Sequence, residues 1–568
     1  MNAFTLVVFC ATLAVFVTAT PCKDASNGRV YQPGVSYLMD DCGSLKACLG
    51  GQILTMPYKC VPNSHCGREG AFPMCVCNTG FKKAGDINSP CRRDRMGLKG
   101  PEPKAIVGNL GDLGVEMKKN GMLMGKVFQK WAEEYGETFG YLSGRDLFVV
   151  SKNLDLIQSV LVKRFDCFTD RMQMPMISGA LSESLLVVEH SKWKYMRSTL
   201  SPTFTTGKIK KMTATVSHKI DNVLNELEKH ANIGKCFDIF EIYKGMTLDV
   251  IAKVAFGLDT NCIGDPEDSF FVHVRKYFNE MPSPSKNLTV MLAVLFPEIG
   301  PLCGLWWSKT AKQGRAEAWL FDVLSNVIKE RAATHDPNSD YFDTLKLLLD
   351  QSQTADENGR YLTHWEIANN SFVFLLAGYE TTSTALAFST WLLAKHQDKQ
   401  DILAQELIDG LKDLPKDEWY STIMKLPYLD AVFHEATRMY SPITFFVNRT
   451  CTEDCTVDGI AFEKGVQFGV NVLGVHYDPA NWHEPETFLP ERFVDNKSYH
   501  PMSWIPFGAG PRNCIGMRFA EMEYKYALAK MLMRYKIVFG EESEDTIPIK
   551  NDGVMQSAER VIVRVERR

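Results

Sequence analysis

The sequence predicts a mainly helical domain with small β-sheets, preceded by a small disulfide-rich domain. Of the 16 cysteines, eight fall between Cys22 and Cys91, and seven are scattered over residues 92–568. Helical periodicity dominates after Val115, and β-branched runs are short. These observations divide the chain into a leader (1–20), a cysteine-rich module (21–95) and a large helical domain (96–568).

The overall composition is that of a folded protein. The 568 residues are 45% hydrophobic and 23% charged, with a formal net charge of −5. This balance excludes an intrinsically disordered chain and gives no basic footprint for nucleic acid. We therefore expect no nucleic-acid partner.

The leader reads as a secretory signal. Residues 3–19 carry no charge, are rich in Phe, Leu, Val and Ala, and end in the small-residue sequence Val17-Thr18-Ala19. A short uncleaved membrane anchor is the alternative, although 17 residues is the lower limit for a span. Both interpretations place the protein in the secretory pathway, with the endoplasmic reticulum, either its lumen or its membrane, as the expected location and secretion as a further possibility.

The cysteine-rich module has few apolar runs with which to build its own core, so disulfides are expected to stabilise it. Its eight cysteines allow 105 pairings, and the spacing selects none of them. The closing sequence, Cys75-Val-Cys77-Asn-Thr-Gly80-Phe81 followed by Cys91, resembles the end of an EGF-like module. A zinc site is the competing interpretation, but paired Cys-x2-Cys spacings are missing.

A charged stretch and a Gly/Pro hinge mark the domain boundary, over residues 92–103. Beyond it, helical patterns are clear at Leu224–Leu227 and Phe240–Ile251. Strand-like runs occur at Leu147–Val150 and Val561–Val565. These patterns predict helices around small sheets.

A glycine-dense loop, Pro506–Gly516, runs into a helical pattern that begins at Met517. Glycines allow the backbone to approach a large flat ligand, and the amides at a helix start favour the thiolate of Cys514, which can ligate a metal. The loop resembles the haem-binding loop of the cytochrome P-450 superfamily, whose conserved spacing is met by Phe507, Gly510, Arg512, Cys514 and Gly516.

The resemblance implies haem b (iron protoporphyrin IX) with Cys514 as the axial thiolate, a ligand that favours O–O bond cleavage. It also implies that Arg512 offers a charged donor to a propionate and that Phe507 shields the thiolate. Gly516 is expected to belong to the same cofactor-binding loop. The wording of the motifs is closest to the 3-family and thromboxane synthase group.

A second match is Glu435-Ala-Thr-Arg438, whose spacing places both side chains on one helix face. The family pattern adds Arg492 from Pro490-Glu491-Arg492-Phe493. We expect Glu435, Arg438 and Arg492 to form one structural charge cluster.

The third match is a long helix. Thr363-His-Trp-Glu366 is a capping box, and the apolar pattern after it runs to about His396. The centre contains Glu380 and Thr381, where relatives bend the helix above the haem. The resemblance implies that these two residues are catalytic and relay protons during oxygen activation.

Four more residues are expected to bind the cofactor. Trp193 and Arg197 match an i,i+4 pair that reaches the propionates in relatives, whereas Arg171 and Arg449 are matched by local resemblance only. The substrate pocket is expected to include the apolar residues Met172 to Leu181, Phe374, Ala377, Ile443 to Phe446 and Val554-Met555.

Residues 288–307 are strongly apolar but interrupted by Pro297, Gly300 and Pro301, which predicts short helices touching a membrane surface. A buried core segment is the alternative. Lys192, Lys194, Arg518 and Lys525 are candidates for a basic face that docks an electron donor.

The favoured hypothesis is a haem-thiolate monooxygenase that inserts one oxygen atom from O2 into a lipophilic small molecule such as a steroid, lipid or xenobiotic. Electrons would come from a separate NADPH-dependent reductase or another donor. Two alternatives stay open: a haem-thiolate isomerase or peroxygenase acting on lipid peroxides, and a non-catalytic secreted haem or lipid carrier. Sequons at Asn287, Asn369, Asn448 and Asn496 bear on topology, because Asn369 falls within the long helix.

Overall fold

The computed structural model describes residues 90–104, 107–119, 123–172, 176, 179–281, 287–339, 341–353, 359–494, 499–551 and 555–568. Before residue 90 it describes only the backbone of seven short strands. These are β1 (Cys22–Lys23), β2 (Val30–Tyr31), β3 (Ser36–Leu38), β4 (Ser44–Leu49), β5 (Gln52–Pro57), β6 (Ser64–Glu69) and β7 (Phe72–Cys77). The predicted leader and the cysteine pairing of the EGF-like module lie outside the described residues.

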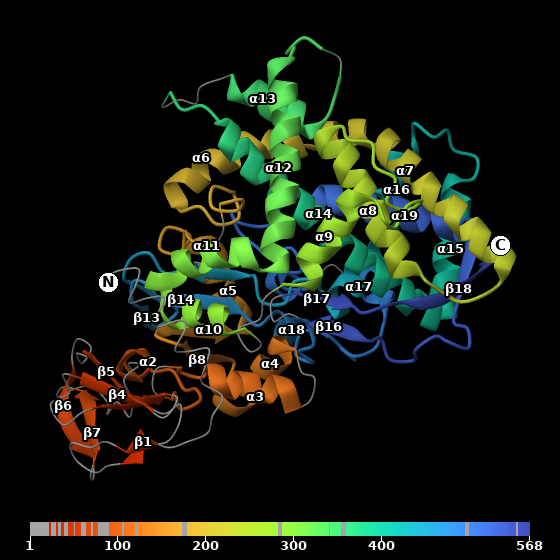
Figure 1. Cartoon of the computed structure of the whole chain (residues 1–568). Helices are drawn as coiled ribbons and strands as arrows, with labels where there is room; N and C mark the ends of the chain where they lie inside the picture. The colour runs from red at the N-terminus through yellow and green to blue at the C-terminus, as the bar shows by residue number, and fades with distance from the viewer. Residues whose placement is uncertain are drawn as a thin grey trace.

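The predicted excess of helix is confirmed in the large domain (Figure 1). Its α-helices are α2 (Pro90–Arg95), α3 (Leu110–Lys119), α4 (Met124–Tyr135), α5 (Leu154–Gln158), α6 (His190–Leu200), α7 (Thr206–Ile233), α8 (Ile239–Phe256), α9 (Ser269–Asn279), α10 (Leu288–Leu295), α11 (Gly300–Thr310), α12 (Lys312–Ala333), α13 (Thr344–Ser352), α14 (His364–Lys395), α15 (Gln397–Leu411), α16 (Trp419–Ile423), α17 (Pro427–Met439), α18 (Val472–His476) and α19 (Met517–Leu532). A π-helix, η1 (Ser159–Lys163), extends α5, and short 3-10 turns are η2 (Ser201–Phe204), η3 (Pro297–Ile299), η4 (Pro490–Phe493) and η5 (Pro501–Ser503).

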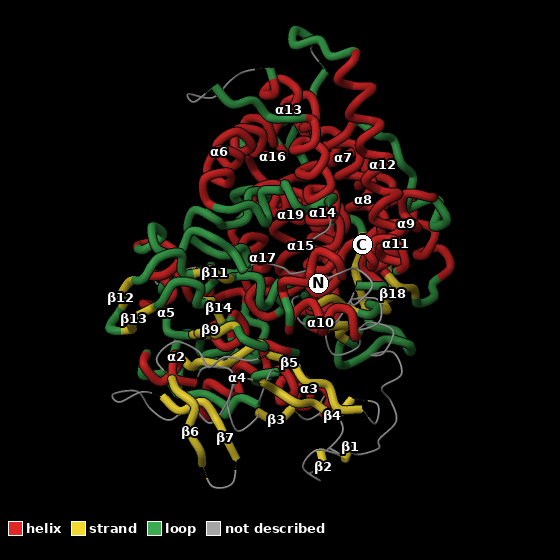
Figure 2. The backbone as a smooth tube through the Cα atoms, turned by 60° about the vertical axis from the view of Figure 1, so that its left-hand side comes forward, coloured by secondary structure: helices red, strands yellow, loops and turns green. Residues whose placement is uncertain are grey.

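The strands of the large domain form small sheets beside this helical body (Figure 2). The largest has the order β11 (Asn448–Thr450), β14 (Gln467–Val470), β9 (Asp146–Ser151) and β8 (Thr138–Ser143), and β14 runs parallel to β9. A three-stranded sheet joins β10 (Phe237–Asp238), β18 (Ile562–Arg567) and β15 (Tyr535–Val538). Two hairpins are β12 (Cys455–Val457) with β13 (Ile460–Phe462), and β16 (Ile549–Asn551) with β17 (Gln556–Ala558).

Helix α14 is the central element of the helical body. It begins at the predicted capping box, in which the Glu366 amide donates to Thr363 Oγ1 at 3.2 Å and the Thr363 amide donates to Glu366 Oε2 at 2.9 Å. Its side chains are buried on nearly every face, which explains why the sequence is apolar all round rather than in one stripe. Its main partner is α8, and together with α7, α17 and α19 these helices enclose the largest hydrophobic core.

Glycine sets the closest approach of α8 and α14. A Cβ built on Gly378 would lie 3.1 Å from two carbon atoms of Ile251, so a larger residue would push the helices apart. Gly378 therefore has a packing role at the centre of α14.

The predicted break of the apolar segment 288–307 is confirmed. It forms α10, η3 and α11, and the two helical parts meet at 119°. Leu302, Leu305 and Trp306 on α11 are more than half exposed. Among the described residues, no helix alone combines the length and apolar character of a membrane span, whereas this bent pair meets both criteria jointly.

The charged stretch before the hinge packs against the large domain. The Arg93 side chain is buried and donates from Nη1 to the Pro101 carbonyl at 2.8 Å. Met96 and Leu98 are buried in the core beside the main sheet, and Arg95 pairs with Glu463. These contacts attach residues 93–98 to the large domain.

Candidate active site

A mainly apolar cavity of about 300 Å³ lies between α14 and the loop that precedes α19. Its volume is within the range of small-molecule pockets. Helix α14 contributes Phe374, Ala377 and Thr381 from one side, and Cys514 lines the other. The arrangement brings together two segments that lie far apart in the sequence.

The Cys514 loop is built on left-handed glycines. Gly508 and Gly510 have φ values of +68° and +72°, which favour glycine. A Cβ on Gly510 would lie 1.9 Å from the Leu161 carbonyl oxygen, so only glycine fits there. The loop is closed by the Cys514 amide, which donates to the Phe507 carbonyl at 2.9 Å. Gly516 lines the cavity next to the start of α19, and a Cβ built on it would meet no atom within 4 Å.

The Cys514 thiol faces the open cavity but is surrounded by protein, and opposing effects act on its pKa. Burial raises its pKa, whereas the amides of Gly516 and Met517 and the charges of Arg171 and Arg197 lower it. The expectation that the helix start favours the thiolate is therefore right about the amides, but burial is the larger effect. A metal ion that binds this sulfur displaces the proton.

Three arginines from separate segments donate hydrogen bonds to backbone carbonyls of the Cys514 loop. Arg171 donates to the Arg512 carbonyl at 2.9 Å, Arg197 to the Asn513 carbonyl at 3.0 Å, and Arg449 to the Ala509 carbonyl at 3.0 Å. All three predicted residues therefore line the cavity and contact the loop, including the two that were matched by local resemblance only.

These guanidinium groups have unused donors. The Nε atoms of Arg171 and Arg449 and Nη1 of Arg512 are buried without a hydrogen-bond partner. Burial and the neighbouring arginines lower the pKa of Arg512 to about 9 and that of Arg449 well below its usual range. Crowded cations with free donors in an apolar cavity fit a flat ligand that carries carboxylates, as the propionates of haem do.

Trp193 and Arg197 lie one turn apart on α6, as their spacing predicts. Both line the cavity, and the Arg512 guanidinium lies over the Trp193 ring at 4.6 Å. Arg512 is also fixed by the Thr169 carbonyl at 2.6 Å and by Asp170 at 3.3 Å. Phe507 lines the cavity below and stacks on Phe433 at a centroid distance of 6.0 Å.

The two residues predicted to be catalytic are placed differently. Thr381 lines the cavity, and its hydroxyl donates to the Ala377 carbonyl at 2.7 Å. Glu380 is buried, with 8% exposure, and lies outside the cavity lining. α14 is helical without a break from His364 to Lys395. At its centre the Thr381 hydroxyl bonds the Ala377 carbonyl one turn earlier and does not interrupt the helix.

Only part of the apolar lining was predicted from the sequence, and the expected residues Met172, Leu181 and Met555 lie outside it. Phe374, Ala377, Ile443 and Phe446 line the cavity as expected. Residues 173–175, 177–178 and Val554 lie outside the described residues. The prediction missed Ile251, Val254 and Ala255, because α8 is apolar on every face and its pattern does not identify the side that meets the cavity.

Glu435, Arg438 and Arg492 lie in one buried cluster on the side of α17 away from the cavity. Arg438 binds Glu435 through two bonds of 2.8 and 2.9 Å, and Arg492 donates to Glu435 at 3.0 Å. Arg438 also donates to the carbonyls of His476 and Pro485. These bonds connect α17, α18 and the segment before η4.

Two of the four cations expected on a docking face form ion pairs within the protein, so the expectation was wrong for them. Lys525 is fully buried between Asp430 and Glu521, and Lys192 pairs with Glu183 and Glu366. Lys194 and Arg518 remain exposed. The i,i+4 spacing of Glu521 and Lys525 is visible in the sequence, but Asp430 comes from α17 and its approach has no local signal.

Comparison with known proteins agrees with this geometry. The profile of the family described as Cytochrome P450 matches residues 98–565. Thromboxane-A synthase from Sus scrofa is 31% identical over 511 residues, covering 84% of this chain and 92% of that protein. Cytochrome P450 3A5 from Homo sapiens is 31% identical over 480 residues with the same coverage.

The family match spans the cavity, the cysteine loop and the arginines around it. The unsatisfied arginine donors and the accessible cysteine fit haem b, the cofactor of that family. The chain therefore belongs to the cytochrome P450 family and binds haem b.

Proposed function

We propose that this protein is a haem-thiolate monooxygenase that inserts one oxygen atom from O2 into a lipophilic small molecule, with Cys514 as the iron ligand. The observation that carries the proposal is the position of the Thr381 hydroxyl and the Cys514 sulfur in one apolar cavity. The apolar lining favours a lipophilic substrate.

Haem b, when bound, supplies the reductive activation of O2. The residues of the chain provide binding and proton handling. Arg171, Arg197, Arg449 and Arg512 would hold the propionates, and the amides of Gly516 and Met517 would donate toward the Cys514 thiolate and stabilise its charge. Phe507 shields this sulfur side from water.

Thr381 is the group that can move a proton at the cavity wall. Its hydroxyl proton points at the Ala377 carbonyl, which leaves the lone pairs of Oγ1 free to accept a proton from water in the cavity. Glu380, on the adjacent face of α14, is the more distant member of the relay. We propose that it exchanges protons with Thr381 through water rather than by direct contact.

Electrons would come from a separate NADPH-dependent reductase or another donor. Lys194 and Arg518 are exposed near the start of α6 and α19, the two helices that flank the Cys514 loop. We propose that these cations, rather than Lys192 and Lys525, contribute to the docking face.

We further propose that the haem domain lies at the membrane of the endoplasmic reticulum and does not pass through its lumen. Asn369 is fully buried, and its side-chain oxygen Oδ1 accepts a hydrogen bond from the Glu183 backbone amide at 2.9 Å. Asn448 is 1% exposed, and its Oδ1 accepts from the Met172 backbone amide at 3.1 Å. A glycan on either residue would prevent this packing. The exposed side chains of α11 would contact the membrane surface.

This topology favours a short anchor over a cleaved signal for residues 1–20, whereas an EGF-like module with disulfides requires translocation. We keep both as predictions. Protease protection in intact microsomes, followed by peptide mapping of residues 21–95, tests them: an accessible haem domain supports the proposed topology, and full protection without detergent contradicts it.

A second candidate is reductase-independent rearrangement of a lipid peroxide. It is favoured by the similarity to a protein named as a synthase, thromboxane-A synthase. The wild type and Thr381→Ala should be compared in turnover with reductase and NADPH and in turnover with an organic hydroperoxide alone. We expect wild-type turnover to require the reductase and Thr381→Ala to lose most of it. Equal reductase-free turnover in both would contradict the monooxygenase proposal.

A further inference from the structure

Three cysteine thiols gather at one place outside the haem cavity. Cys167 follows η1, whereas Cys451 and Cys455 flank the turn that leads into β12. All three carry free thiols; Cys167 and Cys451 are buried, and Cys455 is partly exposed. They lie outside the cavity lining, so the proposed oxygenase chemistry does not use them.

Backbone hydrogen bonds fix the two segments against each other. The Thr452 amide and hydroxyl both donate to the Cys167 carbonyl, at 2.8 and 3.0 Å. Further along, the Thr450 amide donates to the Asp170 carbonyl at 2.7 Å. The cysteines are therefore held close by the fold and not by chance side-chain placement.

The thiols of Cys167 and Cys455 each shift the pKa of the other, and so do those of Cys451 and Cys455. The Arg164 guanidinium joins the two segments: its Nη2 lies 2.7 Å from the Cys167 sulfur, and its Nη1 donates at 3.2 Å to the carbonyl of Thr456, the residue after Cys455. Cys455 has the greatest exposure of the three and is the member that a reagent in solution reaches first.

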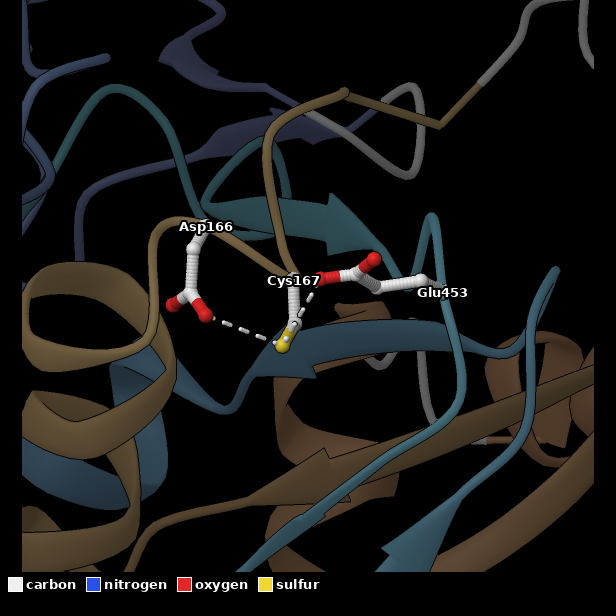
Figure 3. A group of neighbouring side chains, drawn as sticks. All are labelled: Asp166, Cys167 and Glu453. Carbon is white, nitrogen blue, oxygen red and sulfur yellow. Dashed lines mark hydrogen bonds between the residues drawn. The ribbon is translucent and has the colours of Figure 1, made fainter.

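Charged groups surround Cys167 (Figure 3). Its thiol donates to Asp166 Oδ2 at 3.4 Å and to Glu453 Oε1 at 3.7 Å, so the sulfur lies between two carboxylates. Arg164 approaches from the other side, with Nη2 2.7 Å from the sulfur. Burial raises the pKa of Cys167 to about 12; burial also raises the pKa of Cys455, and the charge of Arg164 opposes that rise.

A metal ion is the first ligand to consider at such a group. Asp166, Cys167 and Glu453 place their ligand atoms within 4.8 Å of one another. However, the Arg164 guanidinium already binds both Asp166 and the Cys167 sulfur and supplies the positive charge that a dication would bring. The charges therefore favour thiol chemistry over metal binding.

We propose that Cys167 and Cys455 form a reversible disulfide. The Cys455 thiolate attacks a small-molecule disulfide such as oxidised glutathione, giving a mixed disulfide and releasing one glutathione thiolate. Cys167, whose proton passes through the neighbouring Asp166 carboxylate to solvent, then attacks the Cys455 sulfur, forms the Cys167–Cys455 bond and releases the second glutathione as a thiolate. The two protons lost by the protein thiols are taken up by the two glutathione thiolates. Two protein thiols are oxidised and one glutathione disulfide is reduced to two thiols, so atoms and electrons balance.

The bond would fasten two segments that carry haem-binding arginines. Arg171 lies four residues after Cys167, and Arg449 lies two residues before Cys451. A cross-link between segments far apart in sequence removes much chain entropy from the unfolded state. The disulfide would therefore act as a redox-dependent clamp behind the cofactor site.

The test is to equilibrate the haem-loaded full chain with glutathione buffers from fully reducing to fully oxidising, and to digest it with trypsin without reduction. Cleavage after Arg164 and Arg171 isolates Cys167 in residues 165–171, and cleavage after Arg449 and Lys464 isolates the other two in residues 450–464. We expect one cross-linked species, lighter by two hydrogens than the two reduced peptides together, which disappears in reducing buffer. Cys451→Ala should retain it and Cys455→Ala should lose it.

The matched control is Cys236→Ala, which removes another partly exposed cysteine and should retain the cross-link. The unfolding temperature should rise on oxidation in the wild type and in this control more than in Cys455→Ala. A bond within residues 450–464 alone, no cross-link in oxidising buffer, or thiols protected by one equivalent of added zinc would each overturn the proposal.

Discussion

Replacing Gly510 by alanine tests how the Cys514 loop is held. At φ +72° an alanine costs about 1–2 kcal/mol of backbone strain. Its Cβ would also lie 1.9 Å from the Leu161 carbonyl oxygen, where contacts below 3.0 Å essentially do not occur, so the loop and the Leu161 backbone must move apart by about 1 Å. The shift moves a segment that contains Arg512 and Cys514.

Gly508→Ala is the matched control in the same loop. Its φ of +68° imposes the same strain, but its Cβ would meet only Val447 side-chain atoms at 3.8 Å or more, an ordinary contact. We expect Gly508→Ala to be less stable by about 1–2 kcal/mol and to retain haem. A 1 Å displacement of catalytic groups costs about 100-fold in turnover, so Gly510→Ala should lose both activity and most of its haem.

The assay is haem content per chain by the pyridine haemochrome method, with far-UV circular dichroism to show that each variant is folded. Folded Gly510→Ala with low haem content, beside nearly full content in Gly508→Ala, supports the account. Equal haem content in the two variants would refute the reasoning that the Leu161 contact positions the loop.

Three further predictions concern stability and the membrane. Arg438→Leu leaves Glu435 buried with one cation fewer and should lower the free energy of unfolding by about 3–5 kcal/mol, measured as a lower urea midpoint. The control Lys130→Met, which removes an exposed ion pair, should change the urea midpoint little, and equal midpoints in the two variants would contradict the prediction. Burial lowers the pKa of His476 to about 3 from 6.5, so its contribution to the free energy of unfolding is present above pH 6.5 and is lost as the pH falls toward 3, by about 2 kcal/mol at pH 5. His476→Gln should reduce the dependence of stability on pH in this range, and an unchanged dependence would exclude His476 as its cause. Trp306→Glu should reduce binding to lipid vesicles without changing haem content, and unchanged binding would contradict the proposed membrane contact.

The elements that the sequence predicted well are those with local signals. The capping box at Thr363 gave the start of α14, and the Pro297–Pro301 break gave the bend between α10 and α11. The glycine loop around Cys514 could be identified because a tight turn demands glycine at fixed positions. The capping box and the proline break are determined by residues close in sequence, and so are the left-handed φ values of Gly508 and Gly510; the contact of Gly510 with the Leu161 carbonyl is not.

The features that the sequence did not reveal depend on contacts between distant segments. α8 is apolar on all faces, so its pattern could not show that Ile251 meets the cavity. Lys525 looked like a surface cation until Asp430 of another helix was placed beside it. The approach of Cys167 to Cys455 arises from the pairing of Thr450 with Asp170 and has no local signature.

The most direct test of the account is the absorption spectrum of the reduced, carbon monoxide-bound protein for the wild type, Cys514→Ser and the control Cys262→Ser. Cys262 is a buried cysteine outside the cavity lining, and its amide donates to the Asp249 carboxylate at 2.9 Å. We predict a thiolate-type Soret band in the wild type and in Cys262→Ser, and its loss in Cys514→Ser. A thiolate-type band that persists in Cys514→Ser would show that another residue holds the iron.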